Sequence, residues 1–510
     1  MALLLSVILI ALIVLILGVV LNDYLTGRTE LFTHRNIFLA GMIYFQIYNA
    51  IPVLFNPVAE RYTVQDVESA GQIYVLWATI SVITYLVAYN RVDTIGRVVN
   101  KIRTPATLPS DTTIWLIILT AIPLSAGLRF GVQVPYLGVL LSFIGLALTC
   151  AAAGLAAWQW SVRFLNPVVA FLTLGVFVSS ATISSIGEFS RRPLLSVIFV
   201  IGWGFYYGRF RYLRPLQVLP RVAVLGSVGV IAISLFTVGG RSLTGFTKLL
   251  NPREAIQSVE YVTETYSTAR YALWLIDANY EQDRELTTPP LLTITYAFLL
   301  PVPRAIWVDK PYTVSTYMAD WSDQQGVKRG RGGVTQPAGM LGNSAAEGGT
   351  WTVPLIAIFL ALLTRFFDVL TLRDPTHPIV AIGAATMLGQ AFGLARGETP
   401  VLAFSYWFGQ LSAFFILLFV AKTIDRILGK DHPSNAVFVD ADDGFDEGGE
   451  FDDGDGPWLD EAQDAAEDEL QHEHAQVGSG EGVVWADERY GDWAGDETRH
   501  DTGDDGEQSS

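Results

Sequence analysis

The chain has 510 residues, of which 51% are hydrophobic and only 16% are charged. Soluble domains carry about a quarter charged residues, so this composition excludes an ordinary soluble protein. The formal net charge of −17 belongs to the C-terminal end, since residues 431–510 hold 27 Asp and Glu against two Arg, while residues 1–430 hold 23 acidic and 31 basic residues. The lone Cys150 excludes an intrachain disulfide.

Apolar runs recur along the first 430 residues. A run of about 20 residues spans a hydrocarbon core of roughly 30 Å. The first run lacks a basic leading region and is long for a signal peptide, so we expect a retained helix. The sequence predicts an all-α polytopic membrane protein with eleven spans, at approximately 2–22, 36–55, 70–89, 112–127, 135–159, 163–183, 192–208, 220–238, 351–371, 378–394 and 402–422.

The distribution of Lys and Arg predicts the orientation of these spans. One set of alternating loops and span ends holds 16 Lys and Arg, whereas the other set holds five: Arg61, Arg129, Arg191, Arg192 and Arg396. Basic loops stay in the cytoplasm, so we expect the N-terminus outside and the acidic tail inside. The five cations on the disfavoured side need another explanation, and anion binding is an obvious one.

The long connection between spans 8 and 9, residues 239–350, falls on the predicted external side. Residues 253–280 place apolar side chains at helical spacing, which indicates an amphipathic helix on the membrane face or, equally, a helix packed on the spans. The apolar run in Pro290–Pro303 is too short to span, which is typical of a re-entrant or interfacial segment.

Positive charge follows this apolar run directly. Arg304, Asp309 and Lys310 stand within PVPRAIWVDKP, where we expect them at the level of the lipid headgroups. Further along, the Gly-rich basic run 328–333 (KRGRGG) is either a flexible loop or a phosphate cradle, since free N–H groups and guanidinium donors both suit phosphate oxygens.

The acidic segment 431–510 is rich in Gly, Asp and Glu and poor in apolar residues. Such a composition cannot bury enough surface to offset the entropy of the chain, so it predicts a disordered cytoplasmic tail. A metal or partner site in the tail is the alternative.

Three motifs resemble the O-antigen polymerase (Wzy-type) family, the oligosaccharide repeat unit polymerases, which have many spans and one large extracytoplasmic loop. The resemblance covers roughly residues 1–430 and leaves out the acidic tail. The motifs are SRRPLL at Ser190–Leu195, P-R-x-x-W-x-x-K-P at Pro303–Pro311 and G-N-x(3)-E-G-G at Gly342–Gly349.

The resemblance implies a membrane glycosyltransferase of the cell envelope. Such an enzyme transfers a glycan from one polyprenyl diphosphate carrier to the sugar of another lipid-linked repeat unit, on the outer face of the cytoplasmic membrane. It implies no cofactor, no metal and no nucleic acid. The partners it implies are polyprenyl-diphosphate-linked oligosaccharides, the lipid bilayer, and a chain-length regulator or other polysaccharide-assembly proteins.

The chemistry of that reaction selects the candidate residues. Negative charge grows on the leaving diphosphate, which Arg and Lys can offset, and the acceptor hydroxyl needs a base. Each cation could instead be an interface anchor or a salt-bridge partner, and each carboxylate could pair with a nearby Arg, as Glu188 with Arg191. The diphosphate-binding candidates are Arg191, Arg192, Arg304, Lys310 and Arg396, and the candidate bases are Glu188, Glu347 and Glu398.

Three other readings compete with the polymerase. The related ligases use a His in the external loop, and all six His of this chain fall on the predicted cytoplasmic side, which favours the polymerase. A transporter or flippase of lipid-linked oligosaccharides would also bind diphosphate, although no repeated halves stand out. A membrane scaffold that recruits basic partners through its acidic tail is the third.

Overall fold

The computed structural model describes residues 1–58, 62–91, 94–105, 108–131, 134, 137–185, 191–239, 267–280, 287–318 and 337–428, without the side chains of 191–192 and 228–239. Within these ranges the chain forms helices joined by turns and contains no β-strand. The chain divides into two units, Met1–Asp440 and Ala441–Ser510, and the second unit lies outside the described residues. The predicted disorder of the tail therefore stays a prediction.

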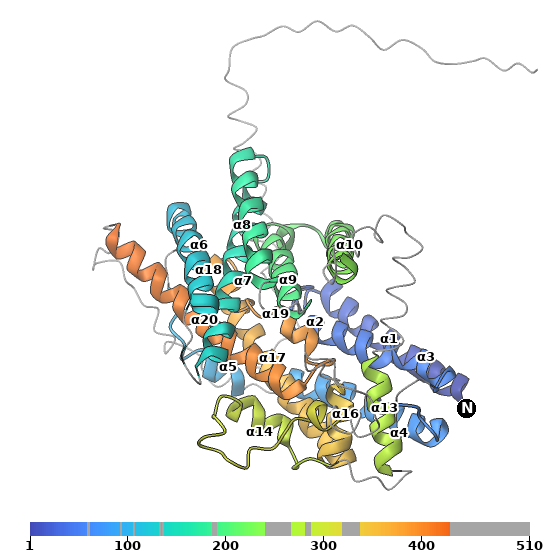
Figure 1. The fold of residues 1–510 in the computed structure, drawn as a ribbon. Helices are drawn as coiled ribbons and strands as arrows, with labels where there is room; N and C mark the ends of the chain where they lie inside the picture. The colour runs from blue at the N-terminus through green and yellow to red at the C-terminus, as the bar shows by residue number, and fades with distance from the viewer. Residues whose placement is uncertain are drawn as a thin grey trace, which may run out of the picture. The chain divides into compact units, whose positions relative to one another are not determined.

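Eight helical segments in the described part of the chain are long and apolar enough to cross a membrane (Figure 1). The prediction of a polytopic all-α membrane protein is confirmed at this level. The eight segments are α1 (Ala2–Leu25), α2–η1–α3 (His34–Met42, Ile43–Tyr48 and Ala50–Phe55), α4 (Val67–Arg91), α6–η2 (Asp111–Ala126 and Gly127–Gly131), α7 (Gly138–Val162), α8 (Pro167–Ser185), α17 (Thr352–Arg373) and α20 (Thr399–Ile427).

The other three predicted spans also fall on helices. They are α9 (Arg191–Gly208), α10 (Pro215–Gly239) and the pair α18 (Pro378–Gly383) and α19 (Leu388–Gly393). Short helices connect some of the long ones: α5 (Thr94–Val99), η3 (Phe210–Tyr212) and η4 (Gly349–Trp351).

Helix α7 is enclosed by its neighbours, and nearly all its residues from Gly145 to Ser161 are buried. It packs against α6, α8, α9 and α20. Small residues make this possible, since a Cβ at Gly204 of α9 would overlap the carbonyl of Gly154. Lipid removes the hydrophobic drive between helices, so close packing of small residues is what holds such helices together.

The second span changes its winding in the middle. After α2 the chain makes one π-helical stretch, η1, before it returns to α-helix at Ala50. The side-chain hydroxyl of Thr33 caps the start of the span, and the carboxylate of Asp368 accepts the backbone N–H groups of His34 and Arg35 at 2.7 and 3.1 Å. π-helical turns are rare and concentrate at functional sites.

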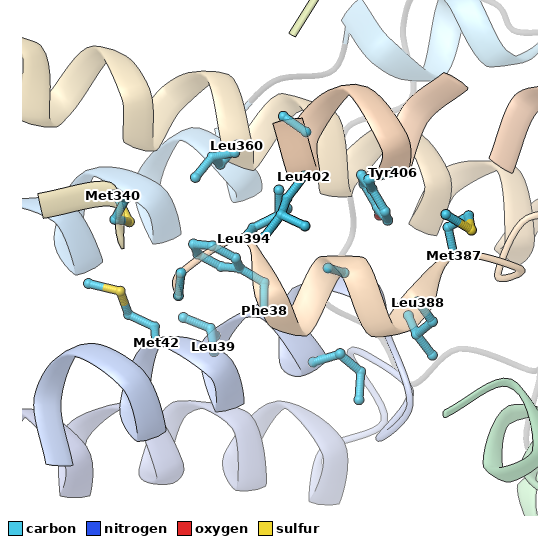
Figure 2. Packing of buried hydrophobic residues seen from close by; sticks show 14 of the residues in the cluster. Phe38, Leu39, Met42, Met340, Leu360, Met387, Leu388, Leu394, Leu402 and Tyr406 are labelled. Atoms are coloured by element: carbon cyan, nitrogen blue, oxygen red, sulfur yellow. The ribbon is translucent and has the colours of Figure 1, made fainter. Parts of the chain in front are cut away.

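The tenth predicted span is broken into two short helices, α18 and α19, separated by Ala384–Met387. The side chain of Gln410 on α20 bridges the break, because its Nε2 donates to the carbonyl of Ala384 and its Oε1 accepts the N–H of Met387 at 3.1 Å. Figure 2 shows α19 lying against α2, with Leu394 among buried side chains that include Phe38 and Leu402.

Three helices of the long connection are described: α13 (Thr268–Tyr280), α14 (Leu292–Leu299) and α16 (Gly339–Glu347). Every residue of α13 from Thr268 to Ala278 is buried, because the helix packs between α16 and α4. Of the two alternatives for residues 253–280, the packed helix is therefore the one observed for Thr268–Tyr280, and residues 253–266 lie outside the described part.

Candidate functional site

Five of the eight predicted site residues have described side chains. Glu188 lies outside the described residues, and Arg191 and Arg192 are described only as the first backbone residues of α9. The basic run 328–333 also lies outside. The described candidates fall on two sets of elements: Arg304, Lys310 and Glu347 around α14, and Arg396 and Glu398 between α19 and α20.

Arg304 and Lys310 occupy one tight turn after α14. The Arg304 guanidinium lies 4.1 Å from the ring centroid of Tyr312 and donates to the carbonyl of Lys310. The Lys310 ammonium donates to the carbonyls of Leu300 and Val302 at 2.6 and 3.0 Å, directly beyond the C-terminal end of α14. A cation is favoured there because the C-terminal end of a helix is partly negative.

The two cations repel each other. Partial burial lowers the pKa of the Lys310 ammonium, and the nearby positive charge of Arg304 lowers it further. Within the described ranges neither side chain forms an ion pair with a carboxylate. The turn also carries the exposed carboxylate of Asp309, so its formal charge is two positive against one negative, and the excess positive charge suits an anion.

The same turn carries an apolar surface. The side chains of Ile306 and Val308 are 77% and 75% exposed. Helix α14 itself lies beside the spans. Nε1 of Trp407 donates a hydrogen bond to the carbonyl of Ala297 at 2.5 Å, and the ring centroids of Phe298 and Phe359 are 5.9 Å apart. This packing accords with the predicted re-entrant or interfacial segment.

The position of Phe359 and Trp407 along their spans indicates how far α14 reaches. Phe359 lies seven residues into α17 and Trp407 eight residues into α20. At 1.5 Å per residue, both contacts lie roughly 10–12 Å along the spans from their starts. The apolar segment therefore runs alongside the bundle instead of resting on its end.

Glu347 is buried at the last residue of α16. Its carboxylate accepts the backbone N–H of Thr293 at 3.0 Å and the hydroxyl of Thr293 at 2.6 Å, in the first turn of α14. Burial raises the pKa of Glu347 to about 7, although the hydrogen bonds from Thr293 act in the opposite direction. A carboxyl group titrating near neutrality has the proton affinity expected of a general base.

Arg396 and Glu398 belong to the turn between α19 and α20. The Arg396 guanidinium lies over the ring of Phe45 at 5.5 Å, and its carbonyl accepts the hydroxyl of Thr268 at 3.4 Å. The preceding carbonyl, that of Ala395, accepts Nε2 of Gln46 at 2.6 Å. Glu398 is the residue directly before α20 and is half-buried.

Other cations on the predicted external side cap helices. A guanidinium nitrogen of Arg129 donates to the carbonyl of Ser184 at 3.2 Å, at the end of α8. Arg270, which is buried in α13, donates to the carbonyls of Asn56 and Pro57 at 2.9 and 3.0 Å, beyond the end of α3. Spans that run outward present negative C-terminal ends on that side, which is a second reason for cations there.

Sequence reasoning missed a group of polar residues inside the spans. Asp368 of α17 is buried and also accepts the hydroxyl of Tyr89 at 2.6 Å, and the His34 ring nitrogen Nδ1 lies 2.7 Å from the hydroxyl of Tyr406. An ionisable residue within an apolar run marks a functional or structural site, so Asp368 carried a usable signal. Gln46 carried a weaker one. In the described residues no group of three His, Cys, Asp or Glu could hold a metal ion.

Comparison with known proteins adds no relative. No family model matches the chain. No curated protein and no solved structure matches it either. The function is therefore argued from the residues and their geometry.

Proposed function

We propose that the chain polymerises lipid-linked oligosaccharide repeat units of a surface polysaccharide, an O-antigen or exopolysaccharide, on the outer face of the cytoplasmic membrane. It transfers a glycan from one polyprenyl diphosphate carrier to the sugar of another. The observation that carries the proposal is the Arg304–Lys310 pair, which places two cations that form no described ion pair beside exposed apolar side chains.

A polyprenyl diphosphate needs both parts of that turn. Its isoprenoid tail stays in the bilayer, where Ile306 and Val308 are exposed, and its diphosphate stays at the headgroup level. Arg offers a fixed fork of donors to phosphate oxygens, and Lys adds a point charge. Electrostatic stabilisation of the leaving diphosphate is usually the largest single contribution that a protein makes to lowering the barrier of such a reaction.

The reaction has two lipid-linked substrates, and the described candidates form two groups. We assign the Arg304–Lys310 pair to one diphosphate and Arg396, with Arg191 and Arg192 at the start of α9, to the other. Glu398 is two residues from Arg396 and is the preferred base for the acceptor hydroxyl. Glu347 has a suitable pKa, but its carboxylate is already bonded to Thr293.

The proposal includes a topology. The chain would cross the membrane eleven times with its N-terminus outside, residues 239–350 outside, and the acidic tail in the cytoplasm. Cysteine accessibility at Thr26 and at Val58, on either side of the second span, tests it: reagent added outside should label Val58→Cys and leave Thr26→Cys unlabelled. The reverse pattern would invert the assignment of every candidate residue.

Removing one cation from either proposed diphosphate site tests the activity. Cells with Arg304→Ala or Arg396→Ala should make no polymer but should still display single lipid-linked repeat units on the outer face. Exposed Arg221 on α10 gives a control, since Arg221→Ala should leave chain length unchanged. Full-length polymer in both candidate variants would overturn the site assignment.

A flippase of lipid-linked oligosaccharides is the second candidate, and the broken helix α18–α19 favours it, because interrupted spans line substrate sites in transporters. Loss of the protein would then strand repeat units on the cytoplasmic side, whereas loss of a polymerase leaves them outside. Deleting residues 435–510 should leave polymerisation intact; loss of polymer in that truncation would favour the scaffold reading of the tail.

A further inference from the structure

Two tyrosines of the π-helical stretch η1 are exposed within a candidate membrane span, Tyr44 at its middle and Tyr48 one turn further toward Phe55. Tyr44 and Tyr48 are 41% and 54% exposed, and their rings are stacked with centroids 6.4 Å apart and planes inclined by 13°. The span runs from His34 to Phe55, so Tyr44 lies ten residues from one end and eleven from the other. At 1.5 Å per residue it is about 15 Å from either end.

The hydroxyls of these tyrosines indicate what they face. Neither hydroxyl makes a hydrogen bond to another described residue of the chain. A hydroxyl without a partner in hydrocarbon loses several kcal/mol, and membrane tyrosines therefore gather at the two interfaces. Exposed tyrosine hydroxyls at this depth are therefore more stable beside water than beside lipid tails.

The tyrosine pair is continuous with Arg396. The Tyr44 and Phe45 ring centroids are 4.8 Å apart, and both rings contact Phe392 of α19, at 6.4 and 5.1 Å. The Arg396 guanidinium lies over Phe45. One chain of aromatic contacts therefore joins the exposed tyrosine pair to the Arg396 guanidinium through Phe45.

Buried hydrogen bonds hold this cluster in place. The hydroxyl of Tyr74 on α4 donates to the Gln46 carbonyl at 2.6 Å and contacts its Oε1 at 2.9 Å, and Gln46 in turn holds the carbonyl of Ala395. Gly339, in the left-handed region with φ +67°, packs so tightly here that a Cβ would overlap Gln46. The stretch η1 is thus tied to the Arg396 turn by its inner face while Tyr44 and Tyr48 remain outward.

We propose that Tyr44 and Tyr48, next to Arg396, form a glycan-binding surface in a water-accessible space within the membrane body. Sugar rings have apolar C–H faces that stack on aromatic rings and hydroxyls that bond to tyrosine hydroxyls, and Arg396 supplies a partner for an acidic sugar or a phosphate. Binding sites of this kind combine aromatic walls with a few polar groups. This rests on the proposed function and assigns the repeat-unit glycan to that surface.

Water access is tested first, because it does not depend on any activity. The only native cysteine, Cys150, is buried, so single substitutions can be labelled in the full chain with a membrane-impermeant maleimide in intact cells. Tyr44→Cys and Tyr48→Cys should be labelled. The controls Leu15→Cys and Phe419→Cys, at exposed positions of α1 and α20, should stay unlabelled because they face lipid. Labelling no faster than in these controls would overturn the proposal.

Glycan binding is tested with a photoreactive residue at position 44 or 48 in cells that make the polysaccharide. The crosslinked protein should carry glycan, and the same residue at position 15 should not. In a polymerisation assay with lipid-linked repeat units extracted from cells lacking the protein, Tyr44→Ala and Tyr48→Ala should raise the apparent KM by about fivefold each. Tyr44→Phe keeps the stacking face but loses the hydroxyl, so it should raise the apparent KM less than Tyr44→Ala does.

The outcomes separate this proposal from the proposed function. Glycan-free crosslinks and an unchanged KM in the alanine variants would refute the glycan surface, even where Arg304→Ala still abolishes polymer. A glycan crosslink at position 44 in a protein whose Arg304→Ala variant makes normal polymer would support the surface and refute the proposed diphosphate site.

Discussion

Glu347 and Lys310 hold opposite ends of the same short helix. The Glu347 carboxylate accepts the first-turn N–H of α14, and the Lys310 ammonium donates to carbonyls beyond its last turn. Each charge has the sign that the helix dipole favours at that end. A candidate base and a candidate diphosphate-binding residue thus also fix the segment that carries the Arg304–Lys310 pair.

Glu347→Gln should retain most activity, because a Gln carbonyl can still accept the N–H and hydroxyl of Thr293. Glu347→Ala leaves those two buried donors without an acceptor and should lower the free energy of unfolding by about 2–3 kcal/mol and reduce polymer. Chain-length profiles and thermal unfolding in detergent measure both effects. A dead but stably folded Glu347→Gln protein would instead identify Glu347 as the base.

Stability should fall as pH rises from about 4.5 to about 7, through the titration of Glu347. The folded protein binds this proton more tightly than the unfolded chain, because burial raises the Glu347 pKa to about 7. The stabilisation is therefore complete below pH 4.5 and lost above pH 7, and a shift of this size corresponds to roughly 3 kcal/mol. Unfolding midpoints of wild type and Glu347→Gln across pH 4–8 should converge at low pH; parallel curves would contradict this assignment.

Arg304→Glu should abolish polymer without destabilising the fold. The new carboxylate lies next to the Lys310 ammonium, so it replaces repulsion by attraction and neutralises the local potential. Thermal stability should stay close to wild type, since the new pair contributes about 0–1 kcal/mol and the lost contact of Arg304 with Tyr312 is worth about 0.5–1 kcal/mol. Arg221→Glu is the matched charge reversal on α10. A charge-reversed Arg304 variant that still polymerised would show that the turn does not bind the diphosphate.

Gly339→Ala should displace the turn that holds Arg396 while leaving the Arg396 side chain itself unchanged. A Cβ at this position overlaps Gln46 and the Ala395 carbonyl, and the backbone has φ +67°, so the change should destabilise by roughly 2–4 kcal/mol. Gly96→Ala, in α5 where nothing lies within 4 Å of the added Cβ, is the control. If Gly339→Ala matched the Gly96 control in melting temperature and chain length, the packing around Arg396 would be looser than described.

The long apolar helices could be predicted because a length of about 20 apolar residues leaves few alternatives in a membrane protein. The nature of α13 could not. Three-and-four spacing of apolar residues is shared by surface helices and by helices packed between others, and the charges of Arg270 and Asp277 suggest exposure. Both charges are buried because they cap other helices, Asp277 by accepting the N–H groups of Gln65 and Asp66 before α4.

In the candidate site, too, some features could be predicted from the sequence and others could not. The run around Arg304 and Lys310 stood out as cations after a short apolar segment, and the structure places them in one turn. The burial of Glu347 depends on Thr293, 54 positions earlier, and the π-helical stretch beside Arg396 is held by a contact between residues 349 positions apart. Gln46 meets Ala395 only because α19 packs against the second span, with Gly41 allowing the close approach to Phe392.

Gln410 fixes the geometry of the interruption between α18 and α19. Its side-chain amide has N–H donors and a carbonyl acceptor, and it supplies one hydrogen bond of each kind to the interruption between α18 and α19. The two half-helices are therefore held at a fixed offset, because the Ala384 carbonyl and the Met387 amide are both hydrogen-bonded within the protein. A side chain of α20 thus makes two hydrogen bonds to backbone groups that would be bonded within the helix if α18 and α19 were continuous.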